Sequence, residues 1–260
     1  MNAACFLCLL FLLGWNSAEP PHAGADSPGF LSSSTQIVVV TTKNWDAVEG
    51  RLQRYERSGM DEAWRRVGEP ISIVVGRKGM GWGRGLSRPD VGSIASDPVK
   101  REGDGKSPAG IFTLGTAFGY ASQPLAGLKM PYLNLTPTIE CVDDPGSKHY
   151  NRIVDSSVVP RDWNSSEQMR SFGESYRWGI LVGHNRMLTG SDAHLPEPGA
   201  GSCIFLHIWQ SDRQGTAGCT AMADVDLESL LIWLDPTRKP VLVQLPEPAY
   251  ENVKDRWRLP

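Results

Sequence analysis

The sequence has no surplus of basic charge, no internal repeat and no long apolar run beyond its N-terminus. Asp and Glu (29 residues) outnumber Lys and Arg (26), which leaves a net charge of -3. Proteins that bind the nucleic-acid backbone need a basic face, so this balance argues against a nucleic-acid partner. With 260 residues and 40% hydrophobic content, the chain can bury a substantial globular core.

Motifs for phosphate and metal binding are also missing. The stretch "GMGWGRG" follows an expected strand but has Arg84 where a dinucleotide-binding loop needs its third glycine. "KREGDGKS" ends like a P-loop but has Lys100 where that loop begins with glycine. No H-E-x-x-H motif or tight Cys/His cluster occurs, so a zinc site would have to be assembled from separate histidines: His149, His184, His194 and His207. We therefore expect neither a metal nor an organic cofactor.

The N-terminus carries the one long apolar run, from Ala4 to Trp15. This run is too short to cross a membrane and is typical of a signal-peptide core, so we expect residues 1–25 to be a signal peptide. Residues 26–34 are rich in Pro, Ser and Gly, which predicts a flexible linker. We expect the mature protein to be exported, into the periplasm or outside the cell.

Removal of the signal peptide would leave an odd number of cysteines. Cys141, Cys203 and Cys219 would remain, so at least one thiol stays unpaired in an oxidising compartment. A Cys141–Cys203 disulfide with a free Cys219 is one arithmetic possibility, and the sequence alone does not select it.

The hydrophobic pattern predicts a mainly β protein with a few helices, an α+β fold. Generous glycine and proline favour turns between short strands. We expect strands in "TQIVVVTT", "PISIVVGR", "AGIFTLG", "IECVDD", "RWGILVG", "SCIFLHIW" and "PVLVQLP". Helical spacing of Trp45, Val48, Leu52 and Tyr55 predicts a helix over 44–58, capped by Asn44, and a second helix is expected over 224–234, with its leucines on one face. Residues 35–69 thus read as a strand–helix segment, either part of the main domain or an appendage, and residues 247–260 as a C-terminal tail.

One histidine and one cysteine stand out near the C-terminus. In "SCIFLHIW", His207 shares a strand face with Cys203 and Phe205, and it is the ionisable group of an otherwise apolar strand. The polar, glycine-bearing "QSDRQGTAG" then allows the chain to turn back toward Cys219. An imidazole can take the proton of a thiol whose pKa is ordinarily near ~8.5. The alternatives are a cysteine acyl-transfer site, or a core histidine beside an idle thiol.

These residues resemble the catalytic motif of the L,D-transpeptidases of the YkuD family, a histidine followed by S/T-H-G-C. His207 matches the first histidine, Thr216 the S/T position, Gly218 the glycine and Cys219 the nucleophile. "GDGKSPAGIFTLGTAFGY" resembles the family's G-D-x-x-T-P-x-G-x-F segment, and the likeness covers about residues 70–246. It implies a YkuD-like β-sandwich or barrel domain, with a helix packed near the catalytic cysteine.

The chain also departs from this pattern. Ala217 replaces the motif's own histidine, Ala221 stands at its terminal Asn/Arg position, and the spacing from His207 to Cys219 is shorter than is typical. A polar group that supports substrate could come instead from His184 or Asn185 in "VGHN". A buried structural role for His184 is the alternative.

The resemblance implies a transfer reaction on peptidoglycan stem peptides by a monomer without cofactor. Cys219, deprotonated by His207, would attack the carbonyl of the third stem residue, and backbone N–H groups of Gly218 and Cys219 would hold the oxyanion. D-alanine would leave and an amine of a second stem would resolve the thioester. Resolution by water would make the enzyme an L,D-carboxypeptidase or amidase. A non-catalytic wall-binding module and a zinc peptidase are the remaining alternatives.

Overall fold

The computed structural model describes Met1 and residues 31–86, 96–186 and 195–260. Apart from Met1, the expected signal peptide lies outside these ranges. The strands are β1 (Gln36–Thr42), β2 (Glu49–Glu56), β3 (Arg65–Val74), β4 (Met80–Trp82), β5 (Ser107–Gly119), β6 (Tyr132–Asn134), β7 (Ile139–Val142), β8 (Ile153–Asp155), β9 (Ser166–Gln168), β10 (Trp178–Val182), β11 (Phe205–Ile208), β12 (Thr220–Met222) and β13 (Val241–Pro246). The helices are α1 (Asp224–Trp233) and α2 (Glu247–Trp257), with 3-10 turns η1 (Leu31–Ser33), η2 (Met169–Ser171), η3 (Gly173–Tyr176) and η4 (Pro236–Arg238). The expectation of a mainly β, α+β fold is confirmed.

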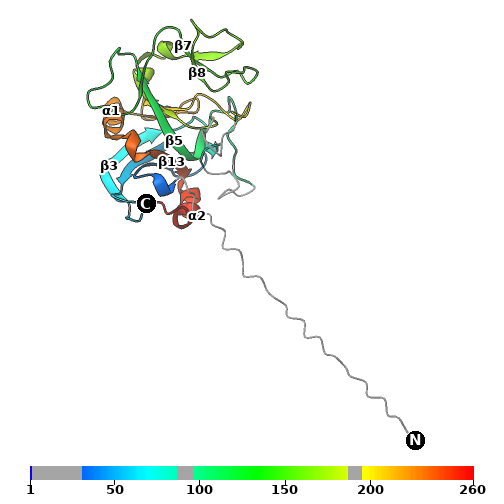
Figure 1. The fold of residues 1–260 in the computed structure, drawn as a ribbon, viewed down its shortest axis with the longest axis vertical. Coiled ribbons are helices and arrows are strands. Elements are labelled where there is room, and N and C mark those ends of the chain that lie inside the picture. Colours follow the sequence, from blue (N-terminus) through cyan, green and yellow to red (C-terminus); the bar gives the residue numbers. More distant parts are fainter. Residues whose placement is uncertain (2–30, 87–95, 187–194) are drawn as a thin grey trace.

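The strands of the main sheet close into a barrel. Their order is β10-β11-β12-β3-β2-β1-β13-β5-β4, and β10 also pairs with β5, which joins the two sides of the sheet. A closed sheet removes the free edges that would otherwise be open to pairing with another chain. A second sheet, β8-β7-β9, lies at the opposite end of the molecule from α2 (Figure 1).

The first strand of the chain lies within the barrel wall. Strand β1 pairs parallel with β13, from Ile37 opposite Val241 to Thr42 opposite Pro246, and antiparallel with β2. Its valines are buried, as the continuous apolar run predicts for a strand covered on both faces. The segment 35–69 therefore contributes neighbouring strands to the same sheet as the rest of the chain.

The helix expected over 44–58 is wrong, because this region forms β2. The side-chain oxygen of Asn44 does accept hydrogen bonds from the backbone N–H of Asp46 and Ala47, as an N-cap would, but it closes a turn. Gly50 explains the strand: a Cβ atom there would lie 2.4 Å from the carbonyl oxygen of Thr41, so close pairing with β1 requires glycine. Glycine also disfavours a helix interior, and long-range pairing on both sides outweighs the helical spacing.

The second expected helix is confirmed as α1, which buries Leu227, Leu230 and Leu231 and contacts β10 and β11. The segment that we expected to be a tail, 247–260, instead contains α2. This helix buries Tyr250, Val253 and other residues, and it packs on β13 and β1. At the other end, the expected linker 26–34 includes η1, in which Leu31 is buried. No helix of the described residues is long and apolar enough to cross a membrane.

Candidate functional site

A pocket of about 330 Å³ opens beside Cys219. Strands β11 and β12 form its floor, because they pair in parallel with Leu206 opposite Thr220 and His207 opposite Ala221. The 3-10 turn η3 and the loop between β11 and β12 form its walls. Its lining residues are Arg77, Glu167, Phe172, Ser175, Tyr176, His207, Trp209, Gln210, Gln214, Gly215, Thr216, Ala217 and Cys219. The structure thus brings the predicted histidine and cysteine into one pocket.

Strand β11 alternates as the sequence predicts. Phe205 packs with Cys203 and Cys219 on one side, whereas Leu206 and Ile208 join the barrel core on the other. This alternation places the His207 ring on the pocket side, where its centroid lies 5.3 Å from that of Tyr176.

The hydrogen bonding of His207 fixes its tautomer. Its Nδ1 lies 2.8 Å from the carbonyl oxygen of Ile208. A carbonyl can only accept, so Nδ1 carries the proton and Nε2 holds a lone pair. Nε2 has no hydrogen-bond partner within the described ranges. Burial lowers the pKa of His207 to about 4, so the imidazole is neutral at pH 7 and can accept a proton.

The thiol of Cys219 is free and buried at the bottom of this pocket. The backbone N–H of Phe205 donates to Sγ at 3.3 Å, and the thiol donates to the carbonyl of Cys203 at 3.5 Å. Burial, and next the negative charge of Glu167, raise the pKa of Cys219 to about 12, against the lowering effect of the interaction between the sulfur and the Tyr176 hydroxyl. The resting nucleophile is therefore a neutral thiol.

The turn that carries Cys219 is braced from both sides. Hydroxyls of Thr216 and Ser107 donate to the Cys219 carbonyl at 2.6 and 2.9 Å, and the Gly218 N–H donates to the Thr216 oxygen. This hydrogen bond engages one of the two N–H groups expected to hold an oxyanion. The backbone N–H of Arg77 donates to the Thr216 carbonyl, which ties the turn to the end of β3. Thr216 thus orients the cysteine turn, and a backbone carbonyl orients His207.

Among the pocket residues that the sequence did not predict, three carry polar or charged groups of interest: Glu167, Tyr176 and Arg77. The Tyr176 hydroxyl donates to the Glu167 carboxylate at 2.8 Å. Desolvation raises the pKa of Glu167 to about 7, against the lowering effect of that hydrogen bond. Arg77 is exposed and has no ion-pair partner among the described residues. No local motif marks these side chains, because tertiary contacts alone bring η3, β9 and the end of β3 together.

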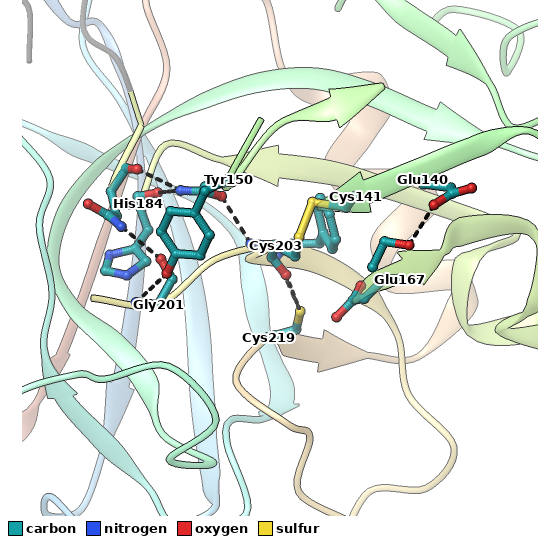
Figure 2. The surroundings of a disulfide bond; sticks show 12 residues. Glu140, Cys141, Tyr150, Glu167, His184, Gly201, Cys203 and Cys219 are labelled. Atoms are coloured by element: carbon teal, nitrogen blue, oxygen red, sulfur yellow. Dashed lines mark hydrogen bonds between the residues drawn. A yellow bond between two sulfur atoms is a disulfide. The ribbon is translucent and has the colours of Figure 1, made fainter. Parts of the chain in front are cut away.

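A disulfide joins Cys141 of β7 to Cys203, with Cys219 left free. Of the pairings that the sequence left open, this is the one present. Cys203 has a positive φ of 54°, and its N–H donates to the side-chain oxygen of Asn151. The disulfide thereby anchors the residue whose carbonyl accepts the thiol of Cys219 (Figure 2).

Comparisons assign no family to this chain. No model of a protein family matches the sequence, and no curated protein matches it. Among solved structures, the crystal structure of the helical cell shape determining protein Pgp2 from Campylobacter jejuni aligns with 84% of this chain, at 16% identity and a TM-score of 0.37. The chain spans 55% of that protein. At this level of similarity, the match assigns neither fold nor activity.

His184 and Asn185, the predicted supporting residues, lie in a different cluster. Nε2 of His184 lies 3.0 Å from the carbonyl of Ala200, and Nδ1 accepts the N–H of Arg84. Burial lowers the pKa of His184 to about 3. The amide of Asn185 bonds backbone groups of Glu197 and Gly201. Neither residue lines the Cys219 pocket.

The other histidines do not assemble a metal site in the described part of the chain. There, no group of three or more His, Cys, Asp or Glu side chains is placed to hold a metal ion. His149 packs edge-on against Trp163, and His194 falls outside the described ranges.

Proposed function

We propose that this chain is a cysteine acyltransferase that acts on the peptide stems of peptidoglycan, as an L,D-transpeptidase. The observation that carries the proposal is a buried free thiol, Cys219, in one pocket with a neutral imidazole, His207, whose Nε2 retains its lone pair. A positioned thiol and a proton acceptor are the parts that nucleophilic acyl transfer requires.

The neutral resting state suits an exported enzyme. Oxidation of a cysteine depends on its thiolate character and its exposure, and Cys219 has little of either. The thiolate forms as a substrate carbonyl enters the pocket. The thiol therefore persists in an oxidising compartment and reacts when it is needed.

The reaction has two halves. In the first, Sγ of Cys219 attacks the carbonyl of the third stem residue, the C–N bond breaks, and D-alanine leaves with a proton on its nitrogen. In the second, an amine of another stem attacks the thioester and gives a proton to Nε2 of His207. The C–S bond then breaks, and His207 passes this proton to the departing sulfur, which restores the Cys219 thiol. Attack by water in place of the amine gives L,D-carboxypeptidase activity.

Arg77 fits the binding of a carboxylate in this reaction. It lines the pocket, is exposed, and is unpaired among the described residues. Guanidinium groups bind carboxylates through paired, charge-assisted hydrogen bonds. Stem peptides end in carboxylates, so we assign Arg77 to holding the D-alanine end.

Intact mass spectrometry with a tetrapeptide stem tests the proposal, with Cys219→Ala as the matched variant. We expect a transient adduct on the wild type, free D-alanine, and neither with Cys219→Ala. A cross-linked dimer indicates transfer, and D-alanine without a dimer indicates hydrolysis. If neither adduct nor D-alanine appears with the folded wild type, the chain is not this enzyme and a binding module is favoured. Turnover that survives in Cys219→Ala and is lost with chelator would instead favour a zinc peptidase.

A further inference from the structure

A line of polar groups leads from Cys219 to a carboxylate that the sequence motif does not include. Tyr176 packs in one cluster with Cys219, and its hydroxyl interacts with the sulfur, which lowers the pKa of Cys219 against burial. The same hydroxyl donates to Oε2 of Glu167 at 2.8 Å. Both Tyr176 and Glu167 line the pocket, and Figure 2 shows Glu167 on the same side of the disulfide as Cys219. A hydroxyl that interacts with both a thiol and a carboxylate can pass a proton from one to the other.

Tyr176 is held rigidly in this position. It is buried, its ring lies edge-on to Phe118, Phe205 and His207, and it stacks on Phe172. Glu167 lies opposite Cys141 in the β7–β9 ladder, so pairing with the strand that carries the disulfide fixes the position of Glu167 along β9. The relay is therefore built from elements that packing already constrains.

We propose that Glu167 takes the proton of Cys219 through the Tyr176 hydroxyl and returns it to the leaving amine. This inference rests on the proposed function, in which the Cys219 sulfur attacks a carbonyl. Tyr176 shares the cluster and the pocket of the reacting sulfur, and Glu167 acts through Tyr176.

The step balances without any other reactant. The S–H bond turns from the Cys203 carbonyl to the Tyr176 oxygen and breaks as that oxygen takes the proton, while the tyrosine O–H proton moves to Oε2 of Glu167. The sulfur then forms its bond to the substrate carbon. When the C–N bond breaks, the proton returns from Glu167 through Tyr176 to the nitrogen, and Glu167 is a carboxylate again.

The charge of the pocket favours this route for the thiol. Transfer of the proton from Cys219 to His207 creates two new charges in a buried site, and a new buried charge is costly. Transfer to an ionised Glu167 moves one negative charge to the sulfur and creates none. The resulting thiolate accepts hydrogen bonds from the Phe205 N–H and the Tyr176 hydroxyl.

Other charged groups face this pair from several elements. Asp143 and Glu102 act on Glu167, and both raise its pKa further after desolvation. Lys100, paired with Asp104, lowers the pKa of Cys219 slightly against burial. The pKa of Glu167, about 7, matches a base that works near neutral pH.

Alkylation of the full chain by iodoacetamide tests the relay without a stem peptide. The rate of Cys219 modification is followed by peptide mass spectrometry from about pH 5 to about pH 9. The variants are Glu167→Gln and Tyr176→Phe, which keep the shape of each side chain, and His207→Gln. Glu174→Gln is the matched control, because Glu174 is an exposed carboxylate on η3 that pairs with Arg177. Near-UV circular dichroism verifies the fold of each variant.

A base works in its ionised form, so the wild-type rate should rise with pH through an inflection near the pKa of Glu167. We expect Glu167→Gln and Tyr176→Phe to lose this inflection and to react about 10²-fold more slowly above it. Glu174→Gln should match the wild type.

Three outcomes would overturn the relay. If folded Glu167→Gln and Tyr176→Phe both kept the wild-type pH dependence of alkylation, Glu167 and Tyr176 would have only a structural role. Faster alkylation of Glu167→Gln would mean that its charge only opposes the thiolate. Loss of the inflection in His207→Gln alone would make His207 the base for the thiol. Each of these is independent of D-alanine release, so a failed stem-peptide assay with an intact relay counts against the proposed function alone.

Discussion

Two buried histidines of this protein differ in how their ring nitrogens are bonded. Both nitrogens of His184 are engaged by backbone groups, of Ala200 and Arg84. Among the residues that the structure describes, His207 has a hydrogen-bond partner at Nδ1 alone, the carbonyl of Ile208, and its ring lines a pocket. Burial lowers both pKa values, so titration does not distinguish them. The hydrogen-bonding of the ring nitrogens distinguishes them. An imidazole with both nitrogens bonded to the backbone stabilises the fold, whereas one with a free nitrogen at a pocket can accept a proton from a reacting group.

The same contrast extends to the residues around each ring. Asn151 and Asn185 lie beside His184, and their side-chain amides donate hydrogen bonds to backbone carbonyls. The polar groups of this cluster therefore already have partners. Around His207, the residues Tyr176, Glu167 and Cys219 line an open pocket, in which the Tyr176 hydroxyl donates to Glu167. Cys203 belongs to both regions, since its N–H bonds Asn151 and its carbonyl accepts the Cys219 thiol.

Exchanging each histidine for glutamine should give the largest effect, and it tests directly whether the two histidines have different roles. We expect His207→Gln to lower kcat by about 10²- to 10⁴-fold with little change in thermal stability, because a proton carrier is lost. His184→Gln should lower the free energy of unfolding by about 1–3 kcal/mol, because buried backbone partners lose their bonds, and should leave kcat near that of the wild type. Stem-peptide kinetics and urea unfolding measure the two quantities. A stable His184→Gln with kcat as low as that of His207→Gln would reverse our assignment.

Removal of the disulfide tests the element that both regions share. The Cys141→Ala/Cys203→Ala variant should lose about 4 kcal/mol of unfolding free energy, because the bridge closes a loop with a sequence separation of 62 residues. Guanidinium unfolding of the oxidised wild type and the variant measures the loss. Cys219→Ala is the control, and it should change stability by about 1 kcal/mol. Equal stability of the wild type and the double variant would contradict a structural role for the bridge.

A pair of arginines should give the smallest effect. Arg77 lines the pocket, whereas Arg84 pairs with Glu197 beside the cluster around His184. We expect Arg77→Gln to raise KM about tenfold, the equivalent of one charge-assisted hydrogen bond to a carboxylate, with stability within about 0.5 kcal/mol of the wild type. Arg84→Gln should leave KM unchanged. The same KM for both variants, whether raised or not, would remove Arg77 from substrate binding.

The sequence predicts the parts of the site that depend on local pattern. Alternation in β11 identifies the face of His207, and the glycine-bearing loop predicts the return to Cys219. Glu167 and Tyr176 have no such pattern, because the pairing of β9 with β7 and the Cys141–Cys203 bridge place them at the thiol. The fold shows the same division. Helix α1 follows from its leucine spacing. Strand β2 instead forms because Gly50 permits close contact with β1, and the local spacing of apolar residues carries no information about that contact.

The parallel register of β11 and β12 has a consequence for how this protein can change. Because Leu206 is locked opposite Thr220 by the ladder, the relative position of His207 and Cys219 does not depend on the length of the loop between them. That loop carries Gln210 and Gln214 into the pocket wall. Insertions, deletions or grafts there would remodel the entrance while the reacting atoms stay in place. The short spacing between His207 and Cys219 then affects the shape of the pocket entrance and leaves the positions of the two side chains unchanged. This loop is the place to redesign which substrates enter the pocket.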